Sequence, residues 1–128
     1  MTASSIRQNI PGASPYEPII GFSRAVRIGN YVHVSGTGPV GADSAGIADQ
    51  TQQCLTLIAT ALTNAGSSID HVYRTRMYLT HVDDWQEAGR IHGQFFSNIR
   101  PAATMLVVAA LLNPGWRIEI EADAFIPA

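Results

Sequence analysis

Residues 103–111 read Ala-Thr-Met-Leu-Val-Val-Ala-Ala-Leu, an almost wholly apolar run with the length of a β-strand. Successive side chains of a strand point to opposite faces of the sheet. One face of this strand therefore carries Ala103, Met105, Val107, Ala109 and Leu111, and the other carries Thr104, Leu106, Val108 and Ala110. A strand with one solvated face alternates polar and apolar residues. The run therefore predicts a strand that needs apolar cover on both faces.

A second strand, over residues 117–125, follows the turn Asn113-Pro114-Gly115, and we expect it to lie beside strand 103–111. Glu119 and Glu121 are two residues apart and project from one face of that strand. A solvated face is the simplest interpretation. If strand 103–111 buries that face in part, a carboxylate there needs a partner and can act as a general base.

The rest of the chain supplies three earlier strands, two helices and one further strand. The prolines of residues 6–20 predict an extended segment and argue against a helix there. Alternation and turn residues then predict strands 22–28 and 31–35, joined by a turn at Gly29-Asn30 and followed by a loop over 36–46. Helical periodicity predicts a helix over 47–65 that Gly66 ends, and a strand over 72–80 follows it. A second helix starts with a capping box of Asp84 and Glu87 and ends before Pro101.

The predicted order is therefore β-β-β-α-β-α-β-β, an α+β arrangement. Right-handed crossovers place both helices on one face of one sheet. Nothing in residues 1–128 is then left to cover the second apolar face of strand 103–111. Another copy of the chain is the simplest cover, so the pattern predicts an oligomer.

Composition excludes several classes of function. The chain has 128 residues, 46% of them hydrophobic, with a net charge of −2 and only arginine as its strong base, which predicts one domain over residues 1–128 without a nucleic-acid surface. The longest apolar stretch, residues 102–112, is shorter than the roughly 20 residues that span a bilayer. Residues 1–7 lack the apolar run of a secretory signal, so we expect a cytoplasmic protein without a membrane partner.

The remaining motifs favour structural interpretations. Gly36-Thr37-Gly38-Pro39-Val40-Gly41 matches the dinucleotide fingerprint, but the loop continues to Gly46 instead of opening into a helix, so a plain turn is favoured. The single cysteine, Cys54, is interpreted as a small core residue. We expect no metal site, because the four histidines form no pair at ligand spacing. Arg74 and Arg76 share a strand face, where ion pairing is favoured over anion recognition.

The C-terminal third resembles a known family. The residues that carry the likeness are Pro101-Ala102-Ala103-Thr104 before the apolar strand, and Ile118-Glu119-Ile120-Glu121-Ala122 after it. They resemble the Rid family, the reactive intermediate deaminases or YjgF-like proteins, whose signature is a Pro-Ala-Arg-Ser/Thr strand followed by a Val/Ile-Glu-Ile-Glu-Ala strand. Val34-Ser35-Gly36 is similar to the family's Ser-Gly turn. The resemblance extends over residues 6 to 126.

This resemblance implies a chorismate-mutase-like α+β fold with one mixed sheet and two helices on one face. It also implies a homotrimer with a small-molecule pocket between each pair of subunits. Typical members hydrolyse 2-iminobutanoate or 2-iminopropanoate to a 2-oxo acid and ammonia, and they need no cofactor.

Carried over residue by residue, the family's pocket is largely altered in this chain. The arginine that clamps the substrate carboxylate falls at Ala103, the pocket tyrosine at Phe22 and the pocket asparagine at Gly89. Ser35, next to Gly36, and Glu121 match the family, and Glu121 is the catalytic candidate. Alanine cannot form the bidentate pair with a carboxylate that arginine forms.

Three residues could compensate. Arg24 lies two residues from Phe22 and so leaves the same strand face, and His92 lies three residues from Gly89 on the same side of its helix. Arg100 directly precedes the last-but-one strand. The alternatives are a surface charge for Arg24 and a core-edge histidine with one bonded nitrogen for His92.

Two functions follow. The first is a trimeric Rid-type hydrolase that acts on an imine, an enamine or a related small metabolite, and for which we do not expect ordinary 2-iminobutanoate deamination. The second is a non-catalytic trimer that binds a metabolite or a protein. Retention of Ser35 and Glu121 favours the first, and the loss of the other pocket residues favours the second.

Overall fold

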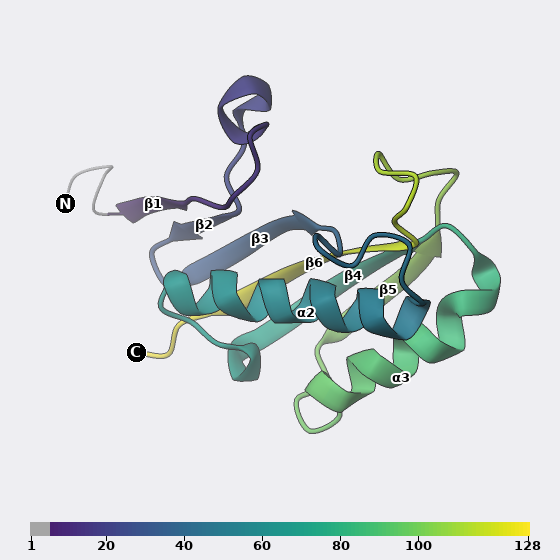
Figure 1. Ribbon diagram of the computed structural model, residues 1–128. Helices are drawn as coiled ribbons and strands as arrows, with labels where there is room; N and C mark the ends of the chain where they lie inside the picture. Colours follow the sequence, from purple (N-terminus) through teal and green to yellow (C-terminus); the bar gives the residue numbers. More distant parts are fainter. Residues whose placement is uncertain (1–5) are drawn as a thin grey trace.

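The computed structural model describes residues 6–128. Residues 1–7 were expected not to be a secretory signal, and residues 1–5 of that segment lie outside the described residues. The predicted α+β order is confirmed (Figure 1). The elements are β1 (Arg7–Ile10), the π-helical turn η1 (Glu17–Gly21), β2 (Ala25–Ile28), β3 (Tyr31–Thr37), α2 (Ile47–Asn64), η2 (Ile69–His71), β4 (Val72–Leu79), η3 (Val82–Asp84), α3 (Trp85–Phe96), β5 (Ala102–Val107) and β6 (Ile118–Phe125).

These strands form one mixed sheet with the order β1-β2-β3-β6-β4-β5, and only β4 and β5 are parallel among its neighbours. The helices α2 and α3 lie on the same face (Figure 1). The prediction that β6 lies beside β5 is wrong, because β4 separates them. The crossover through α3 makes β5 a parallel neighbour of β4, and the long connection over residues 108–117 is free to pass β4 before β6 begins.

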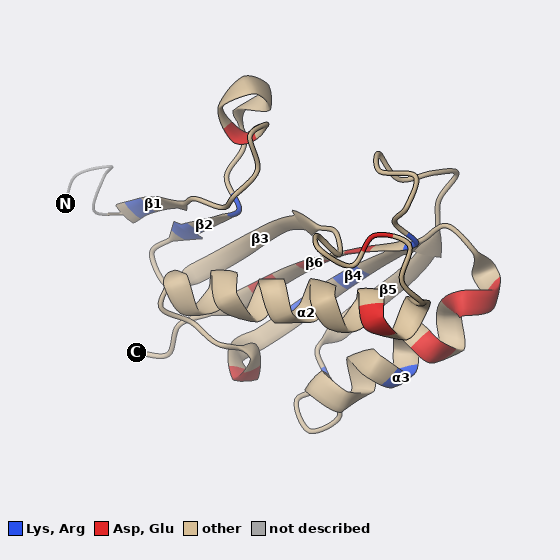
Figure 2. Cartoon of the chain, in the orientation of Figure 1, with Lys and Arg blue, Asp and Glu red and all other residues tan. Residues whose placement is uncertain are grey.

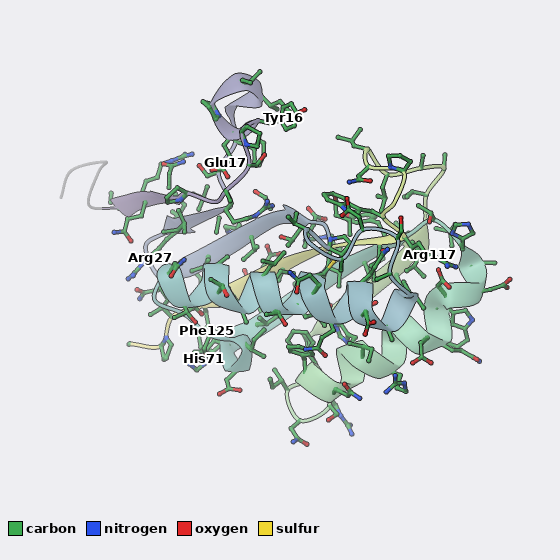
Figure 3. The ribbon with its side chains drawn as sticks, in the orientation of Figure 1. Tyr16, Glu17, Arg27, His71, Arg117 and Phe125 are labelled. Carbon is green, nitrogen blue, oxygen red and sulfur yellow. The ribbon has the colours of Figure 1, made fainter. Side chains whose placement is uncertain are left out.

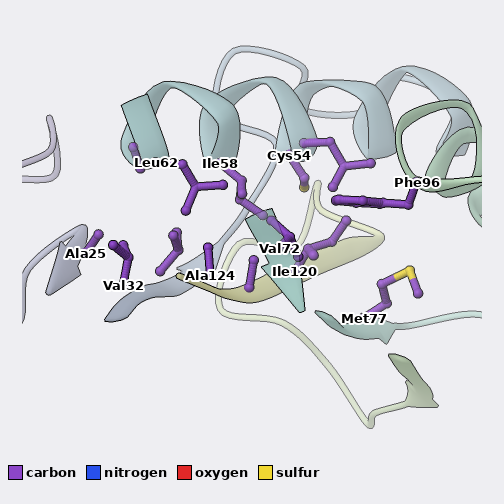
Figure 4. Close-up of a cluster of buried hydrophobic side chains, with 14 of the residues drawn as sticks. Ala25, Val32, Cys54, Ile58, Leu62, Val72, Met77, Phe96, Ile120 and Ala124 are labelled. Atoms are coloured by element: carbon purple, nitrogen blue, oxygen red, sulfur yellow. The ribbon is translucent and has the colours of Figure 1, made fainter. Parts of the chain in front are cut away.

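The core fills the space between the two helices and the sheet (Figure 4). Every second residue of β6 points into it, while α2 contributes a stripe at helical spacing. Cys54 lies in that stripe and is fully buried, which confirms its interpretation as a core residue. Burial raises the pKa of the Cys54 thiol far above its ordinary value.

The apolar strand predicted over residues 103–111 is shorter in the structure, where β5 ends at Val107. It leaves the sheet after Val107, where the amide of Val108 donates to the carbonyl of Leu79, and residues 108–116 continue as a loop. As the edge strand, β5 is poorly covered by the helices, and Leu106 and Val107 on its two faces remain 50% and 52% exposed. Part of the apolar pattern therefore belongs to the loop. In the rest, Met105 packs against the core, while Leu106 and Val107 leave both faces of β5 partly exposed.

The N-terminal segment contains a helical turn that its prolines argued against. Residues 17–21 form η1, which projects from the sheet (Figure 1). Pro18 is tolerated in the first turn because its missing N–H has no helical acceptor there. The Glu17 carboxylate instead accepts hydrogen bonds from the amides of Gly12 and Ser14. The predicted strand 22–28 consequently begins only at Ala25.

The predicted capping box at the start of α3 is wrong. The side chain of Asp84 makes no cap and accepts two 2.9 Å hydrogen bonds from Arg117, while Glu87 pairs with Arg90 one turn later. The guanidinium of Arg117 binds both oxygens of the buried Asp84 carboxylate, so this bidentate ion pair takes the place of a cap. The stop at Gly66 is confirmed, with φ of +91°.

Candidate functional site

The face of the sheet that lies away from the helices, termed the open face, carries the polar residues of the middle strands. Ile118 and Ile120 of β6 point under the helices, so Glu119 and Glu121 point to the open face. Tyr78 of β4 is in register with Glu119 and projects to the same side. The prediction that the two glutamates share one face is therefore confirmed.

A cavity of about 330 Å³ lies on this face, at the end of the sheet where the loop after β5 folds back. Its lining is Tyr78, Val108, Ala110, Leu111, Glu119 and Glu121. The loop thus supplies an apolar wall, and the strands supply two carboxylates and a phenol. A second hollow of about 590 Å³ lies near Tyr31, Tyr73 and Phe125 (Figure 3 labels Phe125) and contains no predicted site residue.

The Ser35-Gly36 turn forms the next part of the site. The register between β3 and β6 shifts between Val34 and Thr37, which is a bulge at these two residues. A Cβ atom at Gly36 would lie 2.6 Å from a carboxylate oxygen of Glu119, so that carboxylate lies directly against the Gly36 backbone and would have to move if a larger residue stood there. The Ser35 hydroxyl donates to the carbonyl of Ser23 at 2.6 Å.

Arg24 lies beside this bulge. Its guanidinium donates to the carbonyl of Gly36 and lies 6.0 Å from the centre of the Phe22 ring. Burial lowers the pKa of Arg24, while the charges of Glu17 and Glu119 act to raise it. The structure therefore brings together the predicted residues Phe22, Arg24 and Gly36, with the Glu119 carboxylate beside Gly36 and the charges of Glu17 and Glu119 both acting on Arg24.

The two carboxylates of the cavity differ in their partners. Glu121 accepts a hydrogen bond from the Tyr78 hydroxyl, and that bond is the main cause of a raised Tyr78 pKa. Within residues 6–128 no hydrogen bond reaches the Glu119 carboxylate, and burial raises its pKa above the ordinary range, with Arg24 opposing. Sequence reasoning chose Glu121 and passed over Glu119, although its position two residues away on the same face was a signal for it.

The other predicted residues lie on the opposite side of the sheet. Ala103 is in register with the buried Thr75, so its side chain points to the helix side of the sheet. Gly89 lies on the same side, since a Cβ atom there would lie 4.0 Å from Met105 of β5. His92 forms a 2.9 Å hydrogen bond through Nε2 with the Thr75 hydroxyl, and burial lowers its pKa. Within one chain, Ala103, Gly89 and His92 therefore do not reach the cavity.

The arginines examined as alternatives are engaged elsewhere. Arg76 forms an ion pair of 3.2 Å with Asp123, whose other oxygen lies 3.0 Å from His33, which confirms ion pairing for this position. For Arg74 the prediction of ion pairing is wrong, because its guanidinium donates to the neutral hydroxyl of Thr104 on the neighbouring strand β5. Arg100 has a left-handed φ of 56° and donates to the carbonyl of Ser97.

Two further properties hold for residues 6–128. No three histidine, cysteine or acidic side chains come together in a way that could hold a metal ion. No helix in this range is both long and apolar enough to cross a membrane. Basic residues are scattered rather than clustered over the same part of the chain (Figure 2).

Residues 12–126 match the family described as Endoribonuclease L-PSP. The chain belongs to the Rid, or YjgF, family. Among curated Rid relatives, an uncharacterized protein of Streptomyces coelicolor is 33% identical over 98% of this chain and 96% of its own length. The human 2-iminobutanoate/2-iminopropanoate deaminase is also 33% identical, over 95% of this chain and 92% of its own length.

Solved structures of Rid proteins share the fold. A YjgF/YER057c/UK114 family member from Mycobacterium tuberculosis is 45% identical, with a TM-score of 0.87 over 94% of this chain and 99% of the other. A crystal structure of Escherichia coli TdcF with bound serine is 25% identical, with a TM-score of 0.79 over 93% and 94% of the two chains. The chorismate-mutase-like α+β fold implied by the resemblance is thereby confirmed.

Proposed function

We propose that this Rid protein is a cytoplasmic homotrimer that hydrolyses a small imine, enamine or related metabolite in pockets between its subunits. The observation that carries the proposal is the cavity on the open face, where the half-buried Glu119 carboxylate lies against the Ser35-Gly36 bulge without a hydrogen-bond partner from residues 6–128. A desolvated carboxylate with a raised pKa is suited to take a proton from water.

The reaction can be written with these groups. Glu119 takes a proton from a water molecule as its oxygen adds to the carbon of the C=N bond, which gives a carbinolamine. Glu119 then returns the proton to the nitrogen and accepts the proton of the carbinolamine hydroxyl as the C–N bond breaks, so a carbonyl compound and ammonia form. The proton left on Glu119, which balances the charge of the starting iminium, passes to the ammonia, and ammonium leaves. Glu121, held by Tyr78, keeps a second negative charge beside the cationic nitrogen.

The placement of the candidate residues in two groups on opposite faces of the sheet supports the proposed oligomer. One half-site lies on the open face and contains Arg24, Gly36 and Glu119, and the other lies at the β5 edge and contains His92 and Ala103. One subunit cannot close both halves into one pocket. A second copy that packs its β5 edge against the open face joins them and covers the exposed side chains of β5.

The substrate class is supported by relatives and restricted by the residues. A human relative is named for 2-iminobutanoate and 2-iminopropanoate, and the Escherichia coli relative was solved with serine, so small amino or imino compounds are the natural class. Ala103 stands where the resemblance places the carboxylate-binding arginine. An unpaired carboxylate in an apolar cleft is unfavourable, so we do not assign ordinary imino-acid deamination to this chain.

Ammonia release tests the activity. An amino-acid oxidase generates 2-iminobutanoate and an amine oxidase generates alkyl imines, and the decay of each is followed with and without the protein. We expect faster decay of alkyl imines with the wild type and no acceleration with Glu119→Gln. Glu87→Gln removes the same charge from an exposed ion pair on α3 and serves as the control. Equal rates for wild type and Glu119→Gln would show that the proposed base is wrong.

Subunit mixing tests the shared pocket. Glu119→Gln disables the open face, and Ala103→Trp blocks the β5 edge. If each pocket combines two subunits, unfolding and refolding the two variants together restores activity in the mixed trimers. A pocket contained in one subunit gains nothing from mixing. Light scattering tests the trimer independently, and a stable monomer of 13.7 kDa would refute it.

The second candidate is a non-catalytic trimer that binds a metabolite or a protein. The replacement of the family's arginine, tyrosine and asparagine at Ala103, Phe22 and Gly89 favours it. Ligand binding in the cavity without faster imine decay for any substrate would establish this alternative.

A further inference from the structure

We propose that the cavity on the open face binds a small organic cation, an iminium or primary ammonium group on an apolar chain without a carboxylate. This inference rests on the proposed function for the location of the site. It goes further by assigning the charge of the ligand, and by predicting that the site selects against the imino acids that the resemblance implies.

The lining of the cavity carries the first step. Its polar groups are the carboxylates of Glu119 and Glu121 and the hydroxyl of Tyr78, and its apolar wall comes from Val108, Ala110 and Leu111. No lysine, arginine or histidine is among these lining residues. An anion would therefore meet two carboxylates at close range, whereas a cation with an alkyl chain matches both the charge and the wall.

The neighbouring guanidinium groups do not reverse this charge. Arg24 donates to the Gly36 carbonyl, and the negative charges of Glu17 and Glu119 both act on it. Its single positive charge is therefore opposed by two carboxylates, and Glu121 is a third. Arg76 is in register with Glu121 on the open face but is paired with Asp123. The acidic groups around the cavity consequently outnumber the cations available to balance them.

The hydrogen bonding of the carboxylates carries the second step. Tyr78 already donates to Glu121, while Glu119 receives no hydrogen bond from residues 6–128. A half-buried carboxylate that lacks donors is completed by a ligand with N–H groups. An iminium nitrogen between Glu119 and Glu121 donates to both carboxylates.

Calorimetry with two probes of equal length and opposite charge tests the inference. We would titrate butylammonium chloride and sodium butanoate into the full-length wild type and into Glu119→Gln. We expect butylammonium to bind, and Glu119→Gln to weaken it by roughly ten- to hundredfold, because a charged hydrogen bond is lost. Glu87→Gln, with the same change in net charge on α3, should bind butylammonium as the wild type does. Added salt should weaken the wild-type affinity.

The outcomes separate this inference from the proposed function. Butanoate binding as tightly as butylammonium would overturn the inference, since a second subunit would then supply a cation to the pocket. Butylammonium binding that Glu119→Gln leaves unchanged would overturn it as well. Butylammonium binding without accelerated imine decay would support the inference and refute the catalytic function. Fast decay of 2-iminobutanoate with butanoate binding would support the catalytic function and refute the inference.

Discussion

Gln50 is the residue whose replacement should most sharply test how the loops around the cavity are held. Its side chain is fully buried at the start of α2. The amide nitrogen donates to the carbonyls of Ala45 and Gly115, at 3.1 and 2.9 Å, and the amide oxygen accepts from the backbone N–H of Arg117 at 2.7 Å. One glutamine therefore joins the loop before α2 to the segment that enters β6.

The substitution Gln50→Leu keeps a similar volume and removes all three hydrogen bonds. Each backbone group left buried without a partner costs about 1–3 kcal/mol, and the apolar side chain recovers part of the sum. We expect the free energy of unfolding to fall by about 3–5 kcal/mol, a large share of the roughly 5–15 kcal/mol that stabilises a typical domain. The loops should also loosen, which weakens ligand binding in the cavity.

Urea unfolding followed by circular dichroism measures this loss. All proteins are compared at one protein concentration, because the stability of an oligomer depends on concentration. Gln52→Leu is the matched control, since Gln52 lies on the same helix and is exposed, and a surface change there should stay within about 0.5 kcal/mol. A loss of less than about 1 kcal/mol for Gln50→Leu would show that water replaces its hydrogen bonds and that the reasoning is wrong.

Three further predictions concern single residues. A Cβ atom at Gly38 would lie 2.1 Å from the Trp116 ring, so Gly38→Ala should cost about 1–3 kcal/mol and shift the tryptophan fluorescence. Gly46→Ala, with nothing within 4 Å, should leave the fluorescence unchanged and lose only the preference for glycine over alanine at the N-cap of α2. Burial lowers the pKa of His92, so just below the ordinary histidine pKa of about 6.5 the folded protein binds fewer protons than the unfolded chain. The free energy of unfolding should therefore fall as the pH drops through that value. His92→Gln should flatten this pH dependence when it is measured by urea unfolding. Because burial raises the pKa of Glu119, its charged form opposes folding at neutral pH, so Glu119→Gln should raise or preserve the melting temperature while abolishing imine hydrolysis; a clear drop in melting temperature would contradict this sign.

Much of the fold could be predicted from local pattern alone. The periodicity of residues 47–65 and the glycine at 66 predicted α2 to within one residue, because an amphipathic stripe and a left-handed stop are both local signals. The alternation in residues 118–125 likewise predicted β6. The place of β6 within the sheet was not a local property. The connection over 108–117 is long enough for β6 to pair with more than one strand. The position of β6 between β3 and β4 depends on contacts between strands that are far apart in the sequence.

The candidate site could be predicted only in part, for a similar reason. Ser35, Gly36 and Arg24 were proposed from the family's Ser-Gly turn and from the spacing of Arg24 to Phe22, and the structure brings Arg24 to the Gly36 carbonyl although both Phe22 and Arg24 precede β2. The spacing of Glu119 and Glu121 placed both carboxylates on one face, but the closeness of Glu119 to Gly36 on the neighbouring strand β3 is not visible along the sequence. Ala103 was placed in one pocket with Glu121, yet in a single chain they lie on opposite faces.

The burial of Cys54 has a practical consequence for measuring how the protein opens. It is the only thiol in the chain, it lies between α2 and the sheet, and its raised pKa keeps it protonated. A thiol reagent can therefore react only after the helix layer separates from the strands. The rate at which Cys54 is modified therefore measures how often the helix layer separates from the sheet, without an introduced label. A ligand bound in the cavity should lower the rate of Cys54 modification, even though the ligand and the sulfur lie on opposite sides of the sheet.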